Sequence, residues 1–354
     1  MANSSSTLNS RPGQRAVSAR ALWLLPIGIL LVEAALRLMP EGFMERTLDV
    51  RMAEIISMPG PRVQIMGDSV AAGGVDAANV AESAGLPTGS VQNYSLPGTS
   101  PMFAYFTLQR ELAAGRVPGR IIFAPHPGSM KSPKIDRFMG RFATARESVG
   151  LLKHGVPLTE WLFGAACRAS VAMNEREEFR LAVTQGDFGF FATLMEAGIS
   201  VHYSQIKITQ AAPPKVPVLF TPATIPAELE MPFSVDRINA LYIDEFCSLA
   251  AKHGIQVAWV TVPVLRIYNE VAMGGAGGAG EAKFQAYLDA LAARHPNVIL
   301  LRRKLEVYPD NCFNDPWHLN PYGALLFSRE LGKALGGAPS KGAGQISGGE
   351  APGM

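Results

Sequence analysis

The stretch PRVQIMGDSVAAGG, residues 61–74, decides how this chain is interpreted. Its run 62–66 predicts a β-strand, Gly67-Asp68-Ser69 follows at once, and the residues from Val70 onward predict a helix. A serine at such a turn lies at the carboxyl edge of a parallel sheet, where open α/β sheets bind ligands. The helix amino terminus beside it favours negative charge. An isolated Gly-Asp-Ser, however, is more often a turn glycine followed by a helix cap.

The same alternation of strand and helix continues along the chain. Within the helical segments, apolar residues recur at spacings of three and four residues, and the strands between these segments are short and apolar. This pattern predicts an α/β fold, a three-layer, flavodoxin-like sandwich around a parallel sheet of about five strands. The predicted strands are 62–66, 91–96, 120–124, 255–262 and 297–301, and the predicted helices after the first are 102–114, 235–253, 282–294 and 322–335.

A long insertion separates the third strand from the fourth. About 130 residues lie there, far more than a βαβ crossover needs. Residues 131–232 read as several helices followed by a proline-rich stretch, which forms either a cap over the carboxyl edge of the sheet or an ordinary packing layer. Residues 273–281 predict a flexible loop, and residues 337–354 predict a disordered tail.

The amino-terminal residues predict a membrane anchor. Residues 1–20 hold three arginines and no acid, and residues 21–39 are largely apolar up to Glu33. We expect an uncleaved transmembrane helix over 21–39, with a cleaved export signal and a buried helix as alternatives. The positive-inside rule then leaves the leader in the cytoplasm and the α/β domain, 60–335, on the periplasmic or extracellular side. The chain would be a single-pass protein of the cell membrane.

Composition excludes several other classes. The chain has 354 residues, 48% of them hydrophobic and 18% charged, which excludes a disordered or fibrous protein. Because the basic leader accounts for the positive net charge, no basic face for nucleic acid is indicated. Cys167, Cys247 and Cys312 are widely spaced and form no metal or redox motif, so we expect no metal and no cofactor. One disulfide is conceivable in an exported domain, although solitary cysteines are more often small buried apolar residues.

A second motif changes the interpretation of Ser69. Asp315-Pro316-Trp317-His318-Leu319-Asn320 follows the last predicted strand and precedes the final helix. An aspartate three residues before a histidine can bond the imidazole Nδ1 and leave Nε2 free to act as a base. Alone, this pattern is more often a surface aspartate and a half-buried histidine. Together with Gly-Asp-Ser after the first strand, it predicts a nucleophile, a base and an orienting acid in the order Ser69, Asp315, His318.

With these motifs the chain resembles the SGNH, or GDSL-type, hydrolase superfamily. Ser69 matches the nucleophile of the family's first block, and Gly98 of NYSLPG (93–98) matches the glycine whose N–H enters the oxyanion hole. The third block departs from the family, because its customary asparagine is missing from Ala124-Pro125-His126-Pro127-Gly128. The N–H groups of Ser69 and Gly98 would then hold the oxyanion, with His126 or Asn93 as a third donor. His126 also has a simpler interpretation, as a polar residue of a proline-rich turn.

The resemblance implies acyl transfer through a serine ester. Water as acceptor makes an esterase, and a sugar hydroxyl makes an O-acyltransferase. With a membrane anchor, the implied substrate is an ester-linked acyl group, acetyl above all, on an envelope or extracellular polysaccharide, and a membrane-bound acyl-donor protein is an implied partner. The alternatives are a non-catalytic envelope protein that binds or assembles polysaccharide, and an esterase acting on lipid or lipoprotein.

Overall fold

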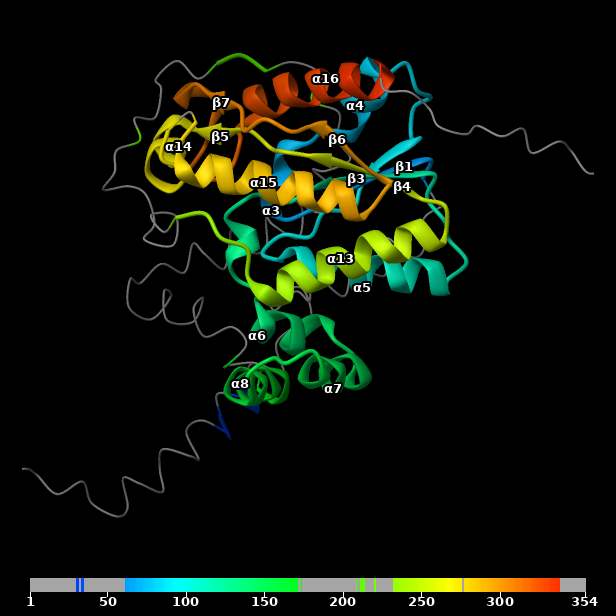
Figure 1. The fold of residues 1–354 in the computed structure, drawn as a ribbon, viewed down its shortest axis with the longest axis vertical. Helices are drawn as coiled ribbons and strands as arrows, with labels where there is room; N and C mark the ends of the chain where they lie inside the picture. Colours follow the sequence, from blue (N-terminus) through cyan, green and yellow to red (C-terminus); the bar gives the residue numbers. More distant parts are fainter. Residues whose placement is uncertain are drawn as a thin grey trace, which may run out of the picture.

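A five-stranded parallel sheet forms the centre of the molecule (Figure 1). The computed structural model describes residues 30–31, 33–34, 61–170, 173, 208, 211–213, 220, 232–275 and 277–337. The strands are β1 (Val63–Gly67), β2 (Val91–Asn93), β3 (Arg120–Ala124), β4 (Gln256–Val260) and β6 (Val298–Arg302). Their spatial order is β2-β1-β3-β4-β6, and every neighbouring pair is parallel. The predicted α/β class and the five-stranded parallel sheet are therefore confirmed.

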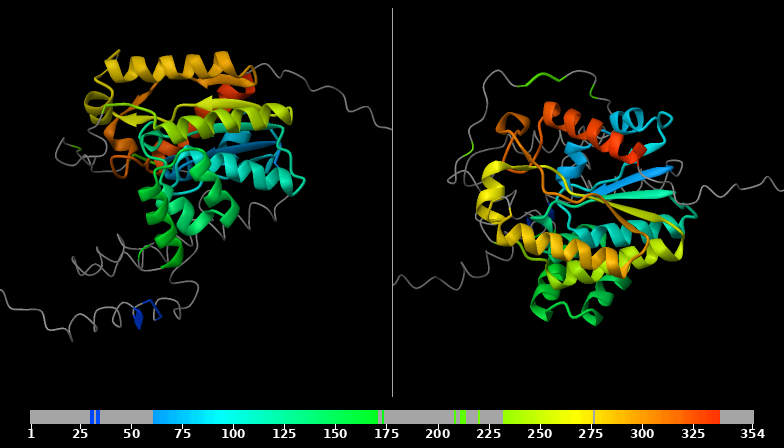
Figure 2. Two further views of the ribbon diagram at one scale, coloured as in Figure 1. Left: turned by 60° about the horizontal axis from the view of Figure 1, so that its bottom comes forward. Right: turned by 45° about the horizontal axis from the view of Figure 1, so that its top comes forward.

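Helices cover both faces of this sheet. In the right-hand view of Figure 2, α4 and α16 lie on one face, and α5, α13 and α15 lie on the other. The chain must cross over between parallel strands, and these helices lie in the crossovers, except α16, which follows the last strand. Their bounds are α3 Ser69–Gly74, α4 Ala77–Ser83, α5 Pro101–Ala113, α13 Arg237–Lys252, α14 Arg266–Ala272, α15 Ala279–Arg294 and α16 Pro321–Gly337.

The strands are apolar because both of their faces are covered. Ile65, Ile122 and Trp259 on the three central strands have no exposed surface. Parallel sheets in α/β proteins show such continuous burial, whereas a half-solvated strand would alternate. The order of strands reverses direction between β1 and β3, so the crevice at their carboxyl ends is the topological switch point of the sheet.

Two details differ from the sequence prediction. A second, two-stranded parallel sheet joins β5 (Val264–Leu265) to β7 (Val307–Tyr308), and runs this short carry no recognisable sequence pattern. The predicted loop 273–281 is wrong at its end, because α15 already begins at Ala279. Close contact explains this early start, since a Cβ on Gly280 would lie 2.7 Å from Met273 Cα and a glycine lets the two segments pack.

The described part of the insertion is a packing layer on α5. It contains η1 (Ser129–Lys131), α6 (Ile135–Arg137), η2 (Phe138–Phe142), α7 (Ala145–Lys153) and α8 (Leu158–Ala169). The rings of Phe103 on α5 and Phe138 meet edge to face at 5.2 Å, within a second apolar cluster separate from the core around the sheet. The cap considered as an alternative would involve the remaining stretch to residue 232, which lies almost entirely outside the described residues.

Most of the predicted anchor also lies outside the described residues. Only residues 30–31 and 33–34 of 21–39 are described, and the leader and residues 338–354 are not. Within the described part of the chain, no helix has the length and apolar character needed to cross a membrane.

A buried carboxyl group links α5 to β1. Glu111 Oε2 accepts a hydrogen bond of 2.8 Å from Gln64 Nε2, and both side chains are buried. Burial raises the pKa of Glu111 to about 7, against the opposing effects of Gln64 and Arg116. Since the folded pKa exceeds the unfolded value of 4.5, the charged carboxylate disfavours folding, and stability falls as pH rises from 4.5 through about 7.

Replacing Glu111 with glutamine should remove this pH dependence. The variant is expected to match the wild type near pH 5 and to be more stable by up to about 3 kcal/mol above pH 8, because a 1-unit shift corresponds to about 1.4 kcal/mol. Urea unfolding at both pH values measures the difference, with Glu160→Gln on exposed α8 as the control. A stability difference between Glu111→Gln and wild type that is the same at both pH values contradicts the prediction.

Candidate active site

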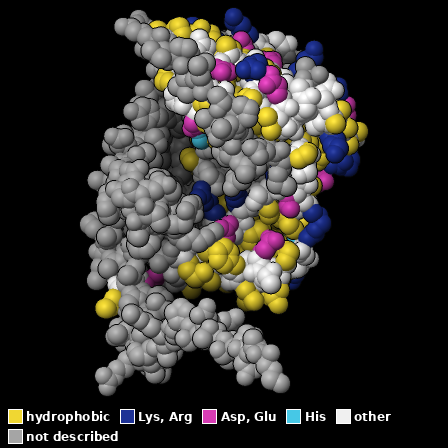
Figure 3. All heavy atoms as spheres, turned by 90° about the vertical axis from the view of Figure 1, so that its left-hand side faces the viewer, with side chains coloured by type: hydrophobic (Ala, Val, Ile, Leu, Met, Phe, Trp, Pro, Cys, Tyr) yellow, Lys and Arg dark blue, Asp and Glu magenta, His cyan; other side chains and the backbone are white. Residues whose placement is uncertain are grey.

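The carboxyl edge of the sheet is the side on which the candidate residues meet. β5 and α14, which follow β4 in the chain, lie on the left in Figure 1, so this edge faces left. Figure 3 shows that side face on: it is hollowed, with a histidine side chain at the upper edge of the hollow and Lys or Arg side chains below it. The loops after β1 and β3 and the loop before α16 all reach this edge.

Close packing dictates the shape of the turn at residues 67–69. Gly67 ends β1, and a Cβ there would lie 2.6 Å from both Ala124 O and Ala71 Cβ. Only a glycine therefore allows α3 to start so close to β3. Ser69 is the first residue of α3 and is partly exposed. Its hydroxyl stands at the amino end of a helix and at the switch point of the sheet.

Asp68 ties this turn to the loop after β3. Its Oδ1 accepts from Val70 N–H at 2.9 Å and caps α3, while Oδ2 accepts from His126 N–H at 2.9 Å. Burial raises the pKa of the Asp68 carboxyl, although the bonds from His126 and Val70 oppose that effect. The helix cap considered as an alternative for this motif is thus present, and it is made by Asp68 while Ser69 remains partly exposed.

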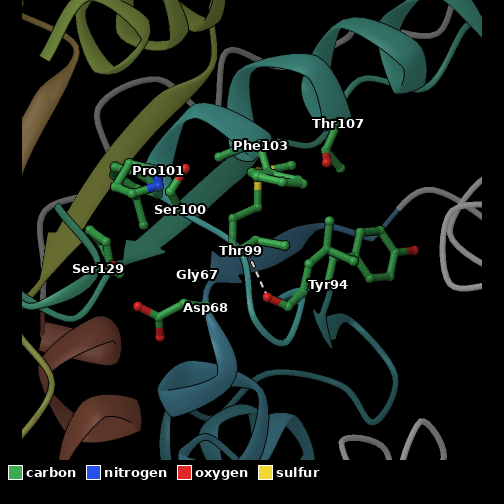
Figure 4. A pocket seen from close by; sticks show the side chains of 14 residues that line it. Gly67, Asp68, Tyr94, Thr99, Ser100, Pro101, Phe103, Thr107 and Ser129 are labelled. Carbon is green, nitrogen blue, oxygen red and sulfur yellow. Dashed lines mark hydrogen bonds between the residues drawn. The ribbon is translucent and has the colours of Figure 1, made fainter. Parts of the chain in front are cut away.

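A small cavity lies behind the turn, on its buried side (Figure 4). Its volume of about 10 Å³ has room for roughly one water molecule. Asp68, Thr99 and Ser129 line it together with apolar residues of β1 and α5, and neither Ser69 nor His318 does. The cavity is therefore not the place where a substrate would meet the candidate nucleophile.

A tight loop holds Asp315 and His318 together. Asp315 Oδ1 accepts from the N–H groups of Trp317 and His318, both at 2.8 Å, and Oδ2 lies 2.8 Å from His318 Nδ1. An antiparallel bridge between Phe313 and Leu319 closes the loop. These contacts orient the carboxylate and the imidazole relative to each other, and none of them involves Ser69.

Asn320 attaches that loop to the final helix. Its Oδ1 accepts from Gly323 N–H at 2.9 Å, and its Nδ2 donates to Asn311 O at 2.7 Å. Asn320 thus occupies the cap position of α16, and Pro321 follows at the first helical position, where the missing N–H costs nothing. The Leu-Asn-Pro that follows His318 is therefore the start signal of a helix.

The structure brings Ser69, His318 and Asp315 together. His318 Nε2 lies 2.9 Å from Ser69 Oγ, across 249 positions of sequence. Burial by itself would lower the pKa of His318, but the hydrogen bond and charge of Asp315, with a contribution from Asp68, outweigh it and raise the pKa. Burial would likewise raise the pKa of Asp315, and its bonds to His318 and Trp317 hold it below the ordinary value. The arrangement can deprotonate the serine and hold the resulting imidazolium.

His126 lies at the same edge, buried against the loop. Gly128 N–H donates to its Nδ1 at 3.0 Å, so a neutral ring carries its proton on Nε2. Burial, followed by the charges of His318 and Lys131, lowers the pKa of His126 to about 3. The imidazole therefore remains uncharged at neutral pH and can only donate from Nε2.

Two aromatic residues that the sequence interpretation missed hold the His126 ring. Its centroid lies 5.1 Å from those of both Tyr268 and Trp317. A Cβ on Gly128 would lie 2.5 Å from the Trp317 ring, which explains the glycine there. Trp317 lies inside the Asp315–His318 motif, so an aromatic residue at that position was a usable sequence signal. No motif in the sequence surrounds Tyr268.

Gly98 has a backbone conformation that favours glycine. Its φ is +69°, a left-handed value that favours glycine. Its carbonyl accepts from Arg137 Nη1 at 3.2 Å. Among the described residues, none accepts a hydrogen bond from the N–H of Gly98 or of Ser69. Both groups can thus donate to a ligand.

Asn93 does not fit the donor role that the sequence suggested for it. Its Nδ2 donates to Ala71 O at 2.9 Å and to Val75 O at 2.8 Å, and its Oδ1 accepts from Ser95 N–H. The side chain is fully buried. Both amide hydrogens are therefore used to close the end of α3, and Asn93 is withdrawn as an oxyanion donor.

The three cysteines are free and buried, so the disulfide considered from the sequence is not formed. The described residues contain no cluster of His, Cys, Asp and Glu that could hold a metal ion.

Comparison of the chain with models of known protein families gives no match, and comparison with curated proteins gives none either. The chemical interpretation of this edge therefore depends on its geometry.

Proposed function

We propose that this chain is a serine-dependent acyl-ester hydrolase or O-acyltransferase of the SGNH, or GDSL, type. The observation that carries the proposal is the continuous chain of hydrogen-bond contacts from Ser69 Oγ through His318 to Asp315, 2.9 and 2.8 Å long. Nucleophile, base and orienting acid in this geometry are the requirements of acyl transfer through a serine ester.

The reaction begins with the serine hydroxyl. His318 Nε2 takes the proton of Ser69 Oγ as that oxygen attacks the ester carbonyl, and Asp315 stabilises the imidazolium. The N–H groups of Ser69 and Gly98 donate to the tetrahedral oxyanion, and the neutral His126 supplies a third donor from Nε2 in place of the missing asparagine. His318 then returns the proton to the leaving alcohol. A second acceptor, water or a sugar hydroxyl, releases the acyl group by the reverse steps.

The proposed substrate is an acyl ester, above all an acetyl ester, of an envelope or extracellular polysaccharide. This part rests on the basic leader and apolar segment 21–39, which would anchor the chain in the cell membrane with the α/β domain outside. A membrane-bound protein would donate the acyl group if the chain is a transferase. Nucleic acid is not among the proposed partners.

Covalent labelling of Ser69 tests the proposal. A fluorophosphonate should label the wild type at one serine, and peptide mass analysis should locate the label at Ser69. Ser69→Ala should lose the label, while Ser90→Ala, a serine at the opposite edge of the sheet, should keep it. An unlabelled wild type that also fails to hydrolyse p-nitrophenyl acetate would favour the non-catalytic alternative, a polysaccharide-binding protein.

Acceptor assays separate the remaining choices. The wild-type protein, shown by its reaction with fluorophosphonate to be active, is incubated with acetylated oligosaccharide. If the chain is an esterase, the oligosaccharide should lose acetate to water. Acetyl transfer to an added oligosaccharide identifies a transferase instead. Faster turnover of a lipid ester than in either oligosaccharide reaction would identify the chain as a lipid esterase.

A further inference from the structure

The helices α7 and α8 form a hairpin at the end of the molecule remote from the sheet (Figure 1). The outer face of α8 is apolar. Leu158, Leu162 and Phe163 are 60%, 54% and 39% exposed, and Ala166 and Ala169 continue the same face at helical spacing. A surface helix of a soluble protein shows the reverse arrangement, with its charged residues outward.

The charged residues of α8 lie away from the centre of this face. Arg168 is exposed, but its guanidinium donates to Ala143 O, on the side of α8 that faces the preceding helices. Glu160 is exposed and lies at one edge of this face, three positions before Phe163, whereas Leu158 and Leu162, two positions away on either side, point in a different direction. Leu158, Leu162 and Ala169 thus form an uncharged strip, with Thr159 between Leu162 and Phe163 and Glu160 at the edge.

The outer face of α7 combines apolar and basic residues. Val149 and Leu152 are 52% and 37% exposed, and they alternate with the exposed Arg146 and Lys153. The acid of this helix points inward, because Glu147 bonds Arg110 at 2.7 Å and the N–H of Thr144 at 2.5 Å. A helix with exposed apolar side chains flanked by cations is the type that lies in the boundary of a lipid bilayer.

A hydrogen bond places the predicted anchor beside this hairpin. Ser170 Oγ, at the end of α8, donates to Glu33 Oε2 at 3.0 Å. Glu33 is the first charged residue after the apolar run 21–32, and Leu30 and Leu31 are each 66% exposed. The end of α8 therefore lies beside the second half of the predicted anchor 21–39.

We propose that α7 and α8 form a membrane-docking surface, defined by Val149, Leu152, Leu158, Leu162 and Phe163, whose partner is the lipid bilayer itself. The apolar side chains enter the acyl boundary, while Arg146 and Lys153 contact lipid phosphates. Their stems are long enough to remain at the headgroups while the neighbouring residues are buried. Docking orients the α/β domain on the membrane in a way that a single anchoring segment cannot.

Depth measurements on the full chain in vesicles test this surface. The chain is reconstituted in vesicles of phosphatidylcholine and phosphatidylglycerol, with a nitroxide on Leu162→Cys, or on Val149→Cys as a second position. The native cysteines are buried, so the label reaches the introduced one. Asp289→Cys on α15, where the native side chain is 51% exposed, is the control in water. The measured quantity is the ratio of the label's collision rate with oxygen to its collision rate with a nickel chelate. This ratio should be several-fold higher at positions 162 and 149 than at position 289.

The other outcomes overturn the proposal. Equal accessibility to the nickel chelate at 162, 149 and 289 would show that the hairpin stays in water. Dipolar broadening between labels at 162 on two chains would assign the surface to a second copy. The Ser69→Ala chain should give the same depths as the wild type, so a failure of the proposed chemistry and a failure of docking are distinguishable. Unchanged thermal unfolding of each variant excludes misfolding.

Discussion

Replacing His318 with alanine is expected to lower kcat/KM for p-nitrophenyl acetate by on the order of 10⁴-fold. The loss is large because the 2.9 Å contact to Ser69 Oγ is the one through which the serine proton leaves. Binding and the N–H donors remain, so a residual rate above that in water is expected. Initial rates of the wild type and variant measure the effect. The variant's unfolding midpoint should stay close to that of the wild type, because His318 is partly exposed.

The pH profile distinguishes a base from a structural histidine. His318 accepts a proton only when neutral, so activity should rise with pH through its pKa, which Asp315 holds above 6.5. Asp315→Asn removes the carboxylate charge that helps to raise this pKa, so the effect of burial is less opposed and the pKa of His318 falls. The variant should be slower, and its acidic limb should move to lower pH. An unshifted limb, or His318→Ala at wild-type rate, would remove His318 from the mechanism.

Gly67→Ala is the second change with a large expected effect. The added methyl group would lie 2.6 Å from both Ala124 O and Ala71 Cβ, so β3 or α3 must shift. Overpacking of this kind costs about 1–3 kcal/mol. Because Ser69 begins the helix that moves, kcat/KM should fall by about 10²-fold, the effect of a displacement near 1 Å.

Gly73 provides a matched control in the same helix. A Cβ at Gly73 meets nothing within 4 Å, so alanine there should stabilise α3 by about 0.5–1 kcal/mol and leave the rate unchanged. Urea unfolding and ester hydrolysis of both variants give the comparison. If Gly67→Ala behaves like Gly73→Ala in both assays, the close packing at the turn does not position Ser69.

The sheet could be predicted from sequence because its strands are buried on both sides. A run such as 120–124, almost wholly apolar, has no other stable environment in a chain of this size, and each boundary was predicted within a few residues. The strand pair β5 and β7 could not be predicted from sequence, because two-residue strands are created by tertiary contact and leave no periodicity. The start of α15 was missed because it depends on how closely Gly280 approaches Met273.

The candidate site divides in the same way. Ser69, Asp315 and His318 were predictable, since local motifs place each on a defined edge of the sheet. Asn93 was assigned wrongly because a sequence does not show that its amide closes α3. Tyr268, which packs on His126, comes from a helix 142 positions away, and only the folded chain brings the two rings together.

Asp315 and His318 belong to one short closed loop, so the three candidate groups come from only two pieces of chain. Among the contacts between those pieces, the one from His318 to Ser69 joins the candidate base to the candidate nucleophile. A displacement of the loop as a rigid body would leave the carboxylate and imidazole paired, yet separate both from the serine at once. Switching such a site off would require no rearrangement within either piece, because separating His318 Nε2 from Ser69 Oγ would be enough.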